Sequence, residues 1–150
     1  MHPVLRTALL GGSAPGTPAA DAALTSLRVA AGLAMAFAHG LGKVPPSEGF
    51  IGAVGGMGFP APVLFAWLAG LAEVVGGLLL AVGLMTRPAA FSILITMVVA
   101  FFIRHGDDPF RQKELAFLFM FISLAFVFLG SGRFGLDRFL RKSAKGETAD

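Results

Sequence analysis

The residues from Val63 to Met85 are apolar or glycine throughout, with one exception, the carboxylic acid Glu73. A helix of this length spans the hydrocarbon core of a bilayer, so the run restricts the chain to a membrane fold. Glu73 lies near its middle, roughly 15 Å from either aqueous layer. An ionisable group at that depth costs about 2.5–3.5 kcal/mol to insert and normally faces a partner group or a polar cavity. We therefore expect any functional site to include Glu73.

The composition agrees with a membrane protein. Of 150 residues, 55% are hydrophobic and 14% are charged, with a mean hydropathy of +0.77. So few polar groups could not cover a globule exposed to water on all sides. The chain has no cysteine, which excludes disulfides, thiolate metal sites and cysteine-ligated clusters within it. The net charge of +3 comes from basic residues that flank apolar runs, which indicates membrane orientation rather than nucleic-acid binding.

The hydropathy pattern predicts an all-α fold, an integral membrane four-helix bundle. The expected spans are residues 24–41, 63–85, 89–103 and 115–129. Thr25 or Asp21 is the expected cap of the first helix. These spans belong to one transmembrane domain of residues 24–142, between a flexible tail (1–23) and a frayed end (143–150).

Two shorter helices are expected outside the spans. Pro45, Pro46 and Ser47 resemble a helix start with Ser47 as the N-cap, and apolar residues then recur at near-helical spacing up to Gly58. Leu136–Lys142 places apolar side chains on one face and basic ones elsewhere. That pattern is typical of an amphipathic helix lying on a membrane surface.

Lysine and arginine are unevenly divided between the two ends of the predicted spans. Eight flank the end that carries both termini: Arg6, Arg28, Arg87, Arg133, Arg138, Arg141, Lys142 and Lys145. Four flank the other end: Lys43, Arg104, Arg111 and Lys113. Because cytoplasmic segments of membrane proteins are enriched in lysine and arginine, both termini are expected in the cytoplasm.

Small residues recur at helical spacing on the first two spans. Gly32, Ala36 and Gly40 follow one another at steps of four, and Glu73 lies four residues before Gly77 on a similar stripe. Such stripes let membrane helices approach closely. Glu73 is therefore expected to face protein rather than lipid.

The predicted topology gathers polar side chains at the end of the bundle opposite the termini. They are His39, Lys43, Arg104, His105 and Glu114. Arg28 approaches Glu73 from the opposite side, with its backbone roughly 10 Å away along the bundle axis, and its long side chain could span part of that gap. With Glu73, these residues are candidates for lining a ligand pocket, and no catalytic residue can be assigned among them.

Three interpretations of Glu73 stay open. The carboxyl group could be hydrogen-bonded by a neighbouring helix in a purely structural role. It could be a protonatable group in a pocket for a quinone or another small amphipathic ligand. It could also contact a partner subunit. His39 and His105 as haem ligands, or with Glu114 as a metal site, form weak patterns, so no intrinsic metal or cofactor is predicted.

Several short motifs follow one another in a specific order. They are Arg28, His39-Gly40-Leu41-Gly42-Lys43, Gly56–Pro62, Glu73-Val74-Val75-Gly76-Gly77, Gly83–Arg87, Glu114 and Gly130–Asp137. In this order and spacing, over about residues 27–140, the chain resembles the DoxX family of small four-helix bacterial membrane proteins.

The resemblance implies a multi-pass protein of the bacterial inner (cytoplasmic) membrane. The family takes its name from a subunit of an archaeal thiosulfate:quinone oxidoreductase, and other relatives are linked to membrane-associated oxidoreductase complexes and oxidative-stress defence. Its usual polar positions correspond to Arg28, His39, Lys43, Glu73 and Glu114. Thiosulfate chemistry does not transfer with the resemblance, because fold does not fix function.

The leading hypothesis is a membrane component of an oxidoreductase system with a quinone pocket near Glu73. If the chain is an enzyme, it is a subunit of a quinone-linked oxidoreductase. The alternative is a non-enzymatic anchor or assembly factor that recruits soluble redox enzymes through its basic C-terminal segment. A small-solute carrier is less favoured, because the spans show no inverted repeat. Expected partners are the lipid bilayer and either redox enzymes or a second copy of the chain, and not nucleic acid.

Overall fold

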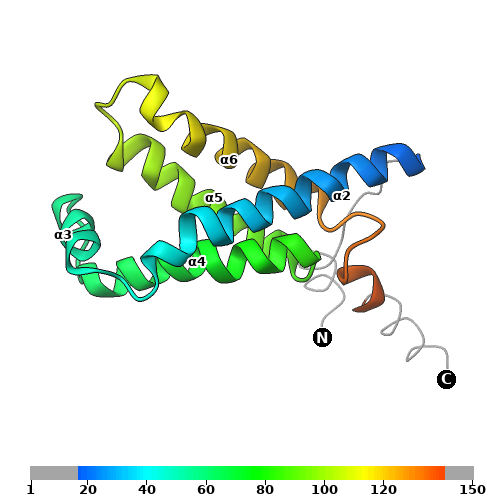
Figure 1. Cartoon of the computed structure of the whole chain (residues 1–150), viewed down its shortest axis with the longest axis horizontal. Coiled ribbons are helices and arrows are strands. Elements are labelled where there is room, and N and C mark those ends of the chain that lie inside the picture. Colours follow the sequence, from blue (N-terminus) through cyan, green and yellow to red (C-terminus); the bar gives the residue numbers. More distant parts are fainter. Residues whose placement is uncertain (1–16, 141–150) are drawn as a thin grey trace.

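The computed structural model describes residues 17–140, and the regular elements of that part are all helical (Figure 1). The first span comprises α2 (Pro18–Leu33), the π-helix η1 (Ala34–Gly40) and the 3-10 turn η2 (Leu41–Lys43). The short helix α3 (Glu48–Gly56) and the long helix α4 (Pro62–Val82) follow. The chain continues through α5 (Thr86–Val99), the π-helix η3 (Ala100–Arg104) and α6 (Phe110–Leu129).

Within the described residues, four of these segments are long and apolar enough to cross a membrane, which confirms the expectation of four candidate spans. They are Pro18–Lys43, Pro62–Val82, Thr86–Arg104 and Phe110–Leu129. The expected start of the first helix was wrong, because its N-cap is Thr17 and not Thr25 or Asp21. The Thr17 hydroxyl accepts a hydrogen bond from the Ala20 N–H, and Pro18 fits the first helical position with its fixed φ. Residues 18–23, expected in the tail, are therefore helical.

The loop helix is confirmed with its cap. The Ser47 hydroxyl accepts a hydrogen bond from the Phe50 N–H at 3.2 Å, and α3 ends at Gly56, two residues before the expected Gly58. The predicted C-terminal helix begins as helical backbone at Asp137 and continues to Leu140. The rest of that helix and both expected terminal tails, apart from residues 17–23, lie outside the described residues.

The long helices form two antiparallel pairs that meet at one end of the bundle. The first-span helix packs against α4, and α5 packs against α6. Figure 1 shows the pairs close together where α4 turns into α5, and diverging toward the end that carries α3. The core that joins them lies mainly between α5 and its neighbours, around Met35, Leu80, Ile93, Met97 and Phe126.

Close contact between the first span and α4 depends on glycine. A Cβ atom on Gly77 would lie 2.7 Å from the Gly32 carbonyl oxygen and 2.8 Å from the Ala36 nitrogen. Both distances are far below van der Waals contact, so only glycine permits this approach at position 77. The predicted small-residue stripes therefore form this interface.

Gly77→Ala should destabilise the bundle by about 1–3 kcal/mol, because the added methyl group forces the two backbones apart. The control is Gly52→Ala on α3, where a Cβ atom would have no neighbour within 4 Å. Unfolding in mixed detergent micelles gives both free energies. Equal stability of the two variants would contradict the close contact.

The two helix pairs meet where α4 turns into α5 (Figure 1), and we refer to this end as the closed end of the bundle. Asp137 fixes the start of α5 there. Its carboxylate accepts hydrogen bonds from the backbone N–H groups of Met85 at 2.7 Å and Thr86 at 3.1 Å. The first N–H groups of a helix have no partner within the helix, so the carboxylate caps α5 from a distant part of the chain. The Asp137 N–H in turn donates to the Gly83 carbonyl at 2.8 Å.

Asp137→Ala should lower the free energy of unfolding by about 1–2 kcal/mol, because two N–H groups at the start of α5 lose their acceptor. Asp107→Ala is the matched control, since Asp107 is exposed in the turn before α6. Chemical unfolding of both proteins in the same micelles measures the difference. A loss of the same size in both would exclude the capping role.

Candidate functional site

A cavity of about 610 Å³ lies where the two helix pairs diverge. Its walls come from α3, α4, α5 and η3, and Lys43 reaches it from the end of the first span. Most of its lining is apolar: Phe50, Ala53, Val54, Met57, Phe59, Phe65, Leu68, Ala69, Ala72, Phe91, Ile95, Val99 and Ala100. The polar lining residues are Lys43, Glu73, Ser92, Thr96, Arg104 and His105.

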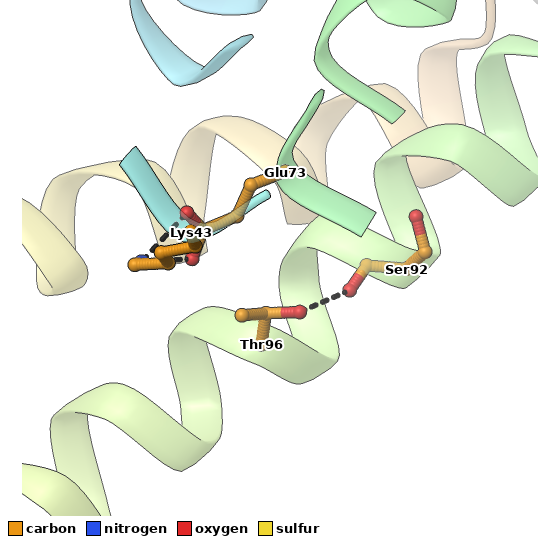
Figure 2. A network of polar contacts seen from close by, with 4 residues as sticks. All are labelled: Lys43, Glu73, Ser92 and Thr96. Carbon is orange, nitrogen blue, oxygen red and sulfur yellow. Dashed lines mark hydrogen bonds and ion pairs between the residues drawn. The ribbon is translucent and has the colours of Figure 1, made fainter. Parts of the chain in front are cut away.

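The central polar feature of the cavity is an ion pair between Lys43 and Glu73. The Lys43 Nζ lies 2.6 Å from each carboxylate oxygen of Glu73 (Figure 2). The Glu73 side chain is only 1% exposed, whereas that of Lys43 is 32% exposed. The pair therefore joins a deeply buried carboxylate to an ammonium group at the cavity surface.

Two glycines bring Lys43 over Glu73. A Cβ atom on Gly40 would lie 2.8 Å from the Val74 nitrogen, and one on Gly70 would lie 2.9 Å from the Lys43 carbonyl oxygen. Both glycines thus let the end of the first span lie directly on α4. The π-helical turns of η1 just before Lys43 change the register of the helix, and such segments are frequent at functional sites.

Ser92 and Thr96 of α5 complete the polar part of the cavity. The Ser92 hydroxyl donates to the Ala89 carbonyl at 2.8 Å, and the Thr96 hydroxyl donates to the Ser92 carbonyl at 3.0 Å. Figure 2 shows them on one helix together with the Lys43–Glu73 pair. With their protons used, the two oxygens keep lone pairs that can accept from a ligand. Sequence reasoning missed them, although two hydroxyl residues four apart on an apolar span share one face.

Arg104 and His105 line the cavity at the α3 end, where the predicted polar cluster was placed. The His105 Nδ1 lies 2.7 Å from an Asp108 carboxylate oxygen, so this histidine has a local partner. Lys43, Glu73, Arg104 and His105 are therefore the predicted site residues that share one cavity.

The other three predicted site residues lie elsewhere. The His39 ring, on the π-helix η1, packs edge-on against Phe119 of α6, with 5.4 Å between the ring centroids, and does not line the cavity. Glu114 is exposed on α6 and outside the cavity. The fourth span was expected to begin at residue 115, but α6 begins at Phe110, so Glu114 lies within the helix and not at its start.

Arg28 belongs to the closed end and does not extend toward Glu73, so that expectation was wrong. The side chain is buried, and Nη1 donates to the carbonyls of Leu80 and Ala81 at 2.7 Å each. These carbonyls lie in the last turn of α4, where the Leu80 carbonyl also accepts from the Gly83 N–H at 3.1 Å. Arg28 is also close enough to Asp137 for electrostatic attraction.

The profile of the DoxX family matches residues 23–106, more than half of the chain. The chain belongs to the DoxX family. Every residue that lines the cavity falls within the matched stretch, whereas Asp137 and all of α6 lie beyond it. No solved structure matches this DoxX chain.

Three relatives are similar to this DoxX protein in sequence. An uncharacterized protein of Haemophilus influenzae is 41% identical over 50% of this chain and 62% of its own length. The protein named "Putative oxidoreductase CatD" of Bacillus subtilis is 32% identical over 79% of this chain and 87% of its own length. An uncharacterized membrane protein of Mycobacterium tuberculosis is 37% identical over 59% of this chain and 63% of its own length. The matched part thus covers less than two thirds of two of these relatives.

In this DoxX protein, loss of Lys43 from the ion pair should lower the free energy of unfolding more than loss of Glu73. Lys43→Met leaves the buried carboxylate without its cation and should cost about 3–5 kcal/mol of stability. Glu73→Gln should cost roughly 1 kcal/mol or less, because the partly exposed ammonium group of Lys43 can turn to water. The double variant should recover most of the stability lost in Lys43→Met.

Unfolding free energies of the two single variants and the double variant form the thermodynamic cycle that measures this coupling. Additive losses would contradict a direct ion pair. A larger loss for Glu73→Gln than for Lys43→Met would contradict the burial of Glu73.

Proposed function

We propose that this protein is the membrane component of an oxidoreductase system and that its cavity binds a quinone or a similar small amphipathic ligand. The observation that carries the proposal is the pairing of Lys43 with the buried Glu73 carboxylate in a cavity whose remaining walls are mostly apolar. Ligand sites typically combine such walls with a few converging polar groups, in volumes of about 300–1,000 Å³. The volume of about 610 Å³ falls within that range.

The chemistry of the polar groups suits a quinone. An ammonium group carries three N–H donors, so Lys43 can hold both Glu73 oxygens and still donate to a carbonyl oxygen of the ligand. The apolar walls suit the ring substituents and the isoprenoid chain. In the reduced form, the ligand hydroxyls would meet acceptors instead, namely the Glu73 carboxylate and the oxygens of Ser92 and Thr96.

In this proposal Glu73 exchanges protons while a partner enzyme exchanges electrons. Reduction of a quinone to a quinol takes up two electrons from the partner enzyme and two protons that come ultimately from water, and a carboxylate beside the ligand is suited to relay these protons one at a time. The oxidoreductase part of the proposal is supported by the name of the Bacillus subtilis relative, which spans most of this chain. The substrate of the partner enzyme is left open.

We further propose that the α3 end faces the outside of the bacterial inner membrane and that both termini are cytoplasmic. The support is the division of lysine and arginine, eight on the side of the termini and four on the other. The cavity and its ion pair then lie in the outer half of the bilayer.

Binding of a quinone should raise the unfolding temperature of the purified protein in lipid nanodiscs. A ligand present at about 100 times its dissociation constant stabilises the folded state by about 2.7 kcal/mol. Glu73→Gln should abolish most of the shift, because Lys43 loses the partner that orients it. The matched control Glu114→Gln removes a carboxylate outside the cavity and should keep the full shift.

Absence of a shift in the wild-type protein would contradict the proposal, as would equal shifts in both variants. In that case the anchor hypothesis becomes the better account. Its test is removal of residues 141–150, which leaves Asp137 and the cap of α5 in place. Truncation from Gly135 would also remove this cap, so a loss of partner binding could not be distinguished from a loss of stability.

A further inference from the structure

The cavity has an apolar edge on the lateral surface of the protein. Leu68 of α4 and Phe91 and Ile95 of α5 all line the cavity. The same residues are 51%, 53% and 48% exposed, respectively. Side chains that line a cavity and are also half-exposed mark its opening, so these three residues mark an apolar opening between α4 and α5. The lining residue Arg104, at the end of its span, is exposed as well. We refer to Leu68, Phe91 and Ile95 as the lateral opening.

The lateral opening lies at the depth of lipid tails. Leu68 lies roughly 9 Å along α4 from its first residue at 1.5 Å of rise per residue. Ile95 lies roughly 13 Å before Arg104 at the end of its span. Both helices are long and apolar enough to cross a membrane, so an opening this far from their ends faces hydrocarbon.

The charged residues of the cavity are distinct from the three residues of the lateral opening. Lys43, Arg104 and His105 line the cavity near the α3 end. The helix α3 contributes Phe50, Val54 and Met57 to the lining, with Val54 only 3% exposed. The hydrogen-bond donors Lys43, Arg104 and His105 and the apolar opening are thus separate parts of the lining.

From this polarity we infer that the ligand reaches the cavity sideways from the bilayer, through the lateral opening, and not from the aqueous phase. Its head group, which must accept hydrogen bonds, lies against Lys43, and its hydrocarbon chain leaves between α4 and α5 among the lipid tails. The inference rests on the proposed function and specifies its ligand as an amphiphile with an acceptor head group and a long apolar chain. A water-soluble quinone analogue would use the head-group site but not the opening.

Two substitutions that narrow the opening test the route. Leu68→Trp and Ile95→Trp place indole rings where the chain of the ligand would lie, and both positions are exposed enough to tolerate a larger side chain. Leu78→Trp is the control, since Leu78 is an exposed residue of α4 that does not line the cavity. The probes are an isoprenoid quinone and the same quinone ring without its chain, titrated into protein in lipid nanodiscs.

We expect both opening variants to bind the isoprenoid quinone about tenfold or more weakly, or to associate with it more slowly by the same factor. The chainless quinone should bind them as it binds the wild-type protein, and Leu78→Trp should change neither ligand. Leu68→Ala and Ile95→Ala widen the opening, so they should speed association and dissociation of the isoprenoid quinone. The affinity for the chainless quinone should stay unchanged in both variants.

Unchanged binding and exchange of the isoprenoid quinone in all four variants would overturn the lateral route. An equal loss of both quinones in the tryptophan variants would also overturn it, because the opening would then not be separate from the head-group site. In either case, loss of binding in Glu73→Gln would keep the proposed function intact. If the wild-type protein binds neither quinone, the proposed function itself is wrong.

Discussion

The need to compensate one carboxylate inside the membrane shapes the open half of this protein. Glu73 lies in a helix that otherwise has only apolar residues and glycine, and it is almost completely buried. A charge in such a place is tolerated only with a partner, and Lys43 supplies it from the end of another span. Gly40 and Gly70 bring these two segments together, and no larger residue would fit there without a shift of the backbone.

The two ends of the bundle have different structural roles. At the closed end, Asp137 caps α5 and Arg28 holds the last carbonyls of α4, so these hydrogen bonds serve helix termini. At the α3 end the helix pairs separate, and Lys43, Arg104 and His105 line a cavity instead. The fixed end keeps the helices in place while the other end remains open, an arrangement suited to binding.

The sequence predicted which residues belong to the site better than it predicted which groups these residues contact. An apolar run with a single acid identified Glu73, and the rule that alternate spans end on the same side brought Lys43, Arg104 and His105 near it. His39 was grouped with them, but it lies on the π-helix η1, where the prediction assumed an α-helix, and contacts Phe119 instead. Arg28 was assigned to the wrong neighbour, since helix-terminal carbonyls leave no mark in a sequence pattern. Asp137 ended a motif that was noticed, but its contact with α5 depends on the tertiary fold.

The most direct test is to identify what the protein carries when it is extracted from its native membrane in mild detergent. Mass spectrometry of the purified wild-type protein should find a quinone or another long-chain amphiphile retained in near-stoichiometric amount. The Glu73→Gln protein should lose it, and the Glu114→Gln protein should retain it. Equal retention in all three proteins, or only bulk membrane lipid in each, would contradict the claim that the Lys43–Glu73 cavity is a ligand site.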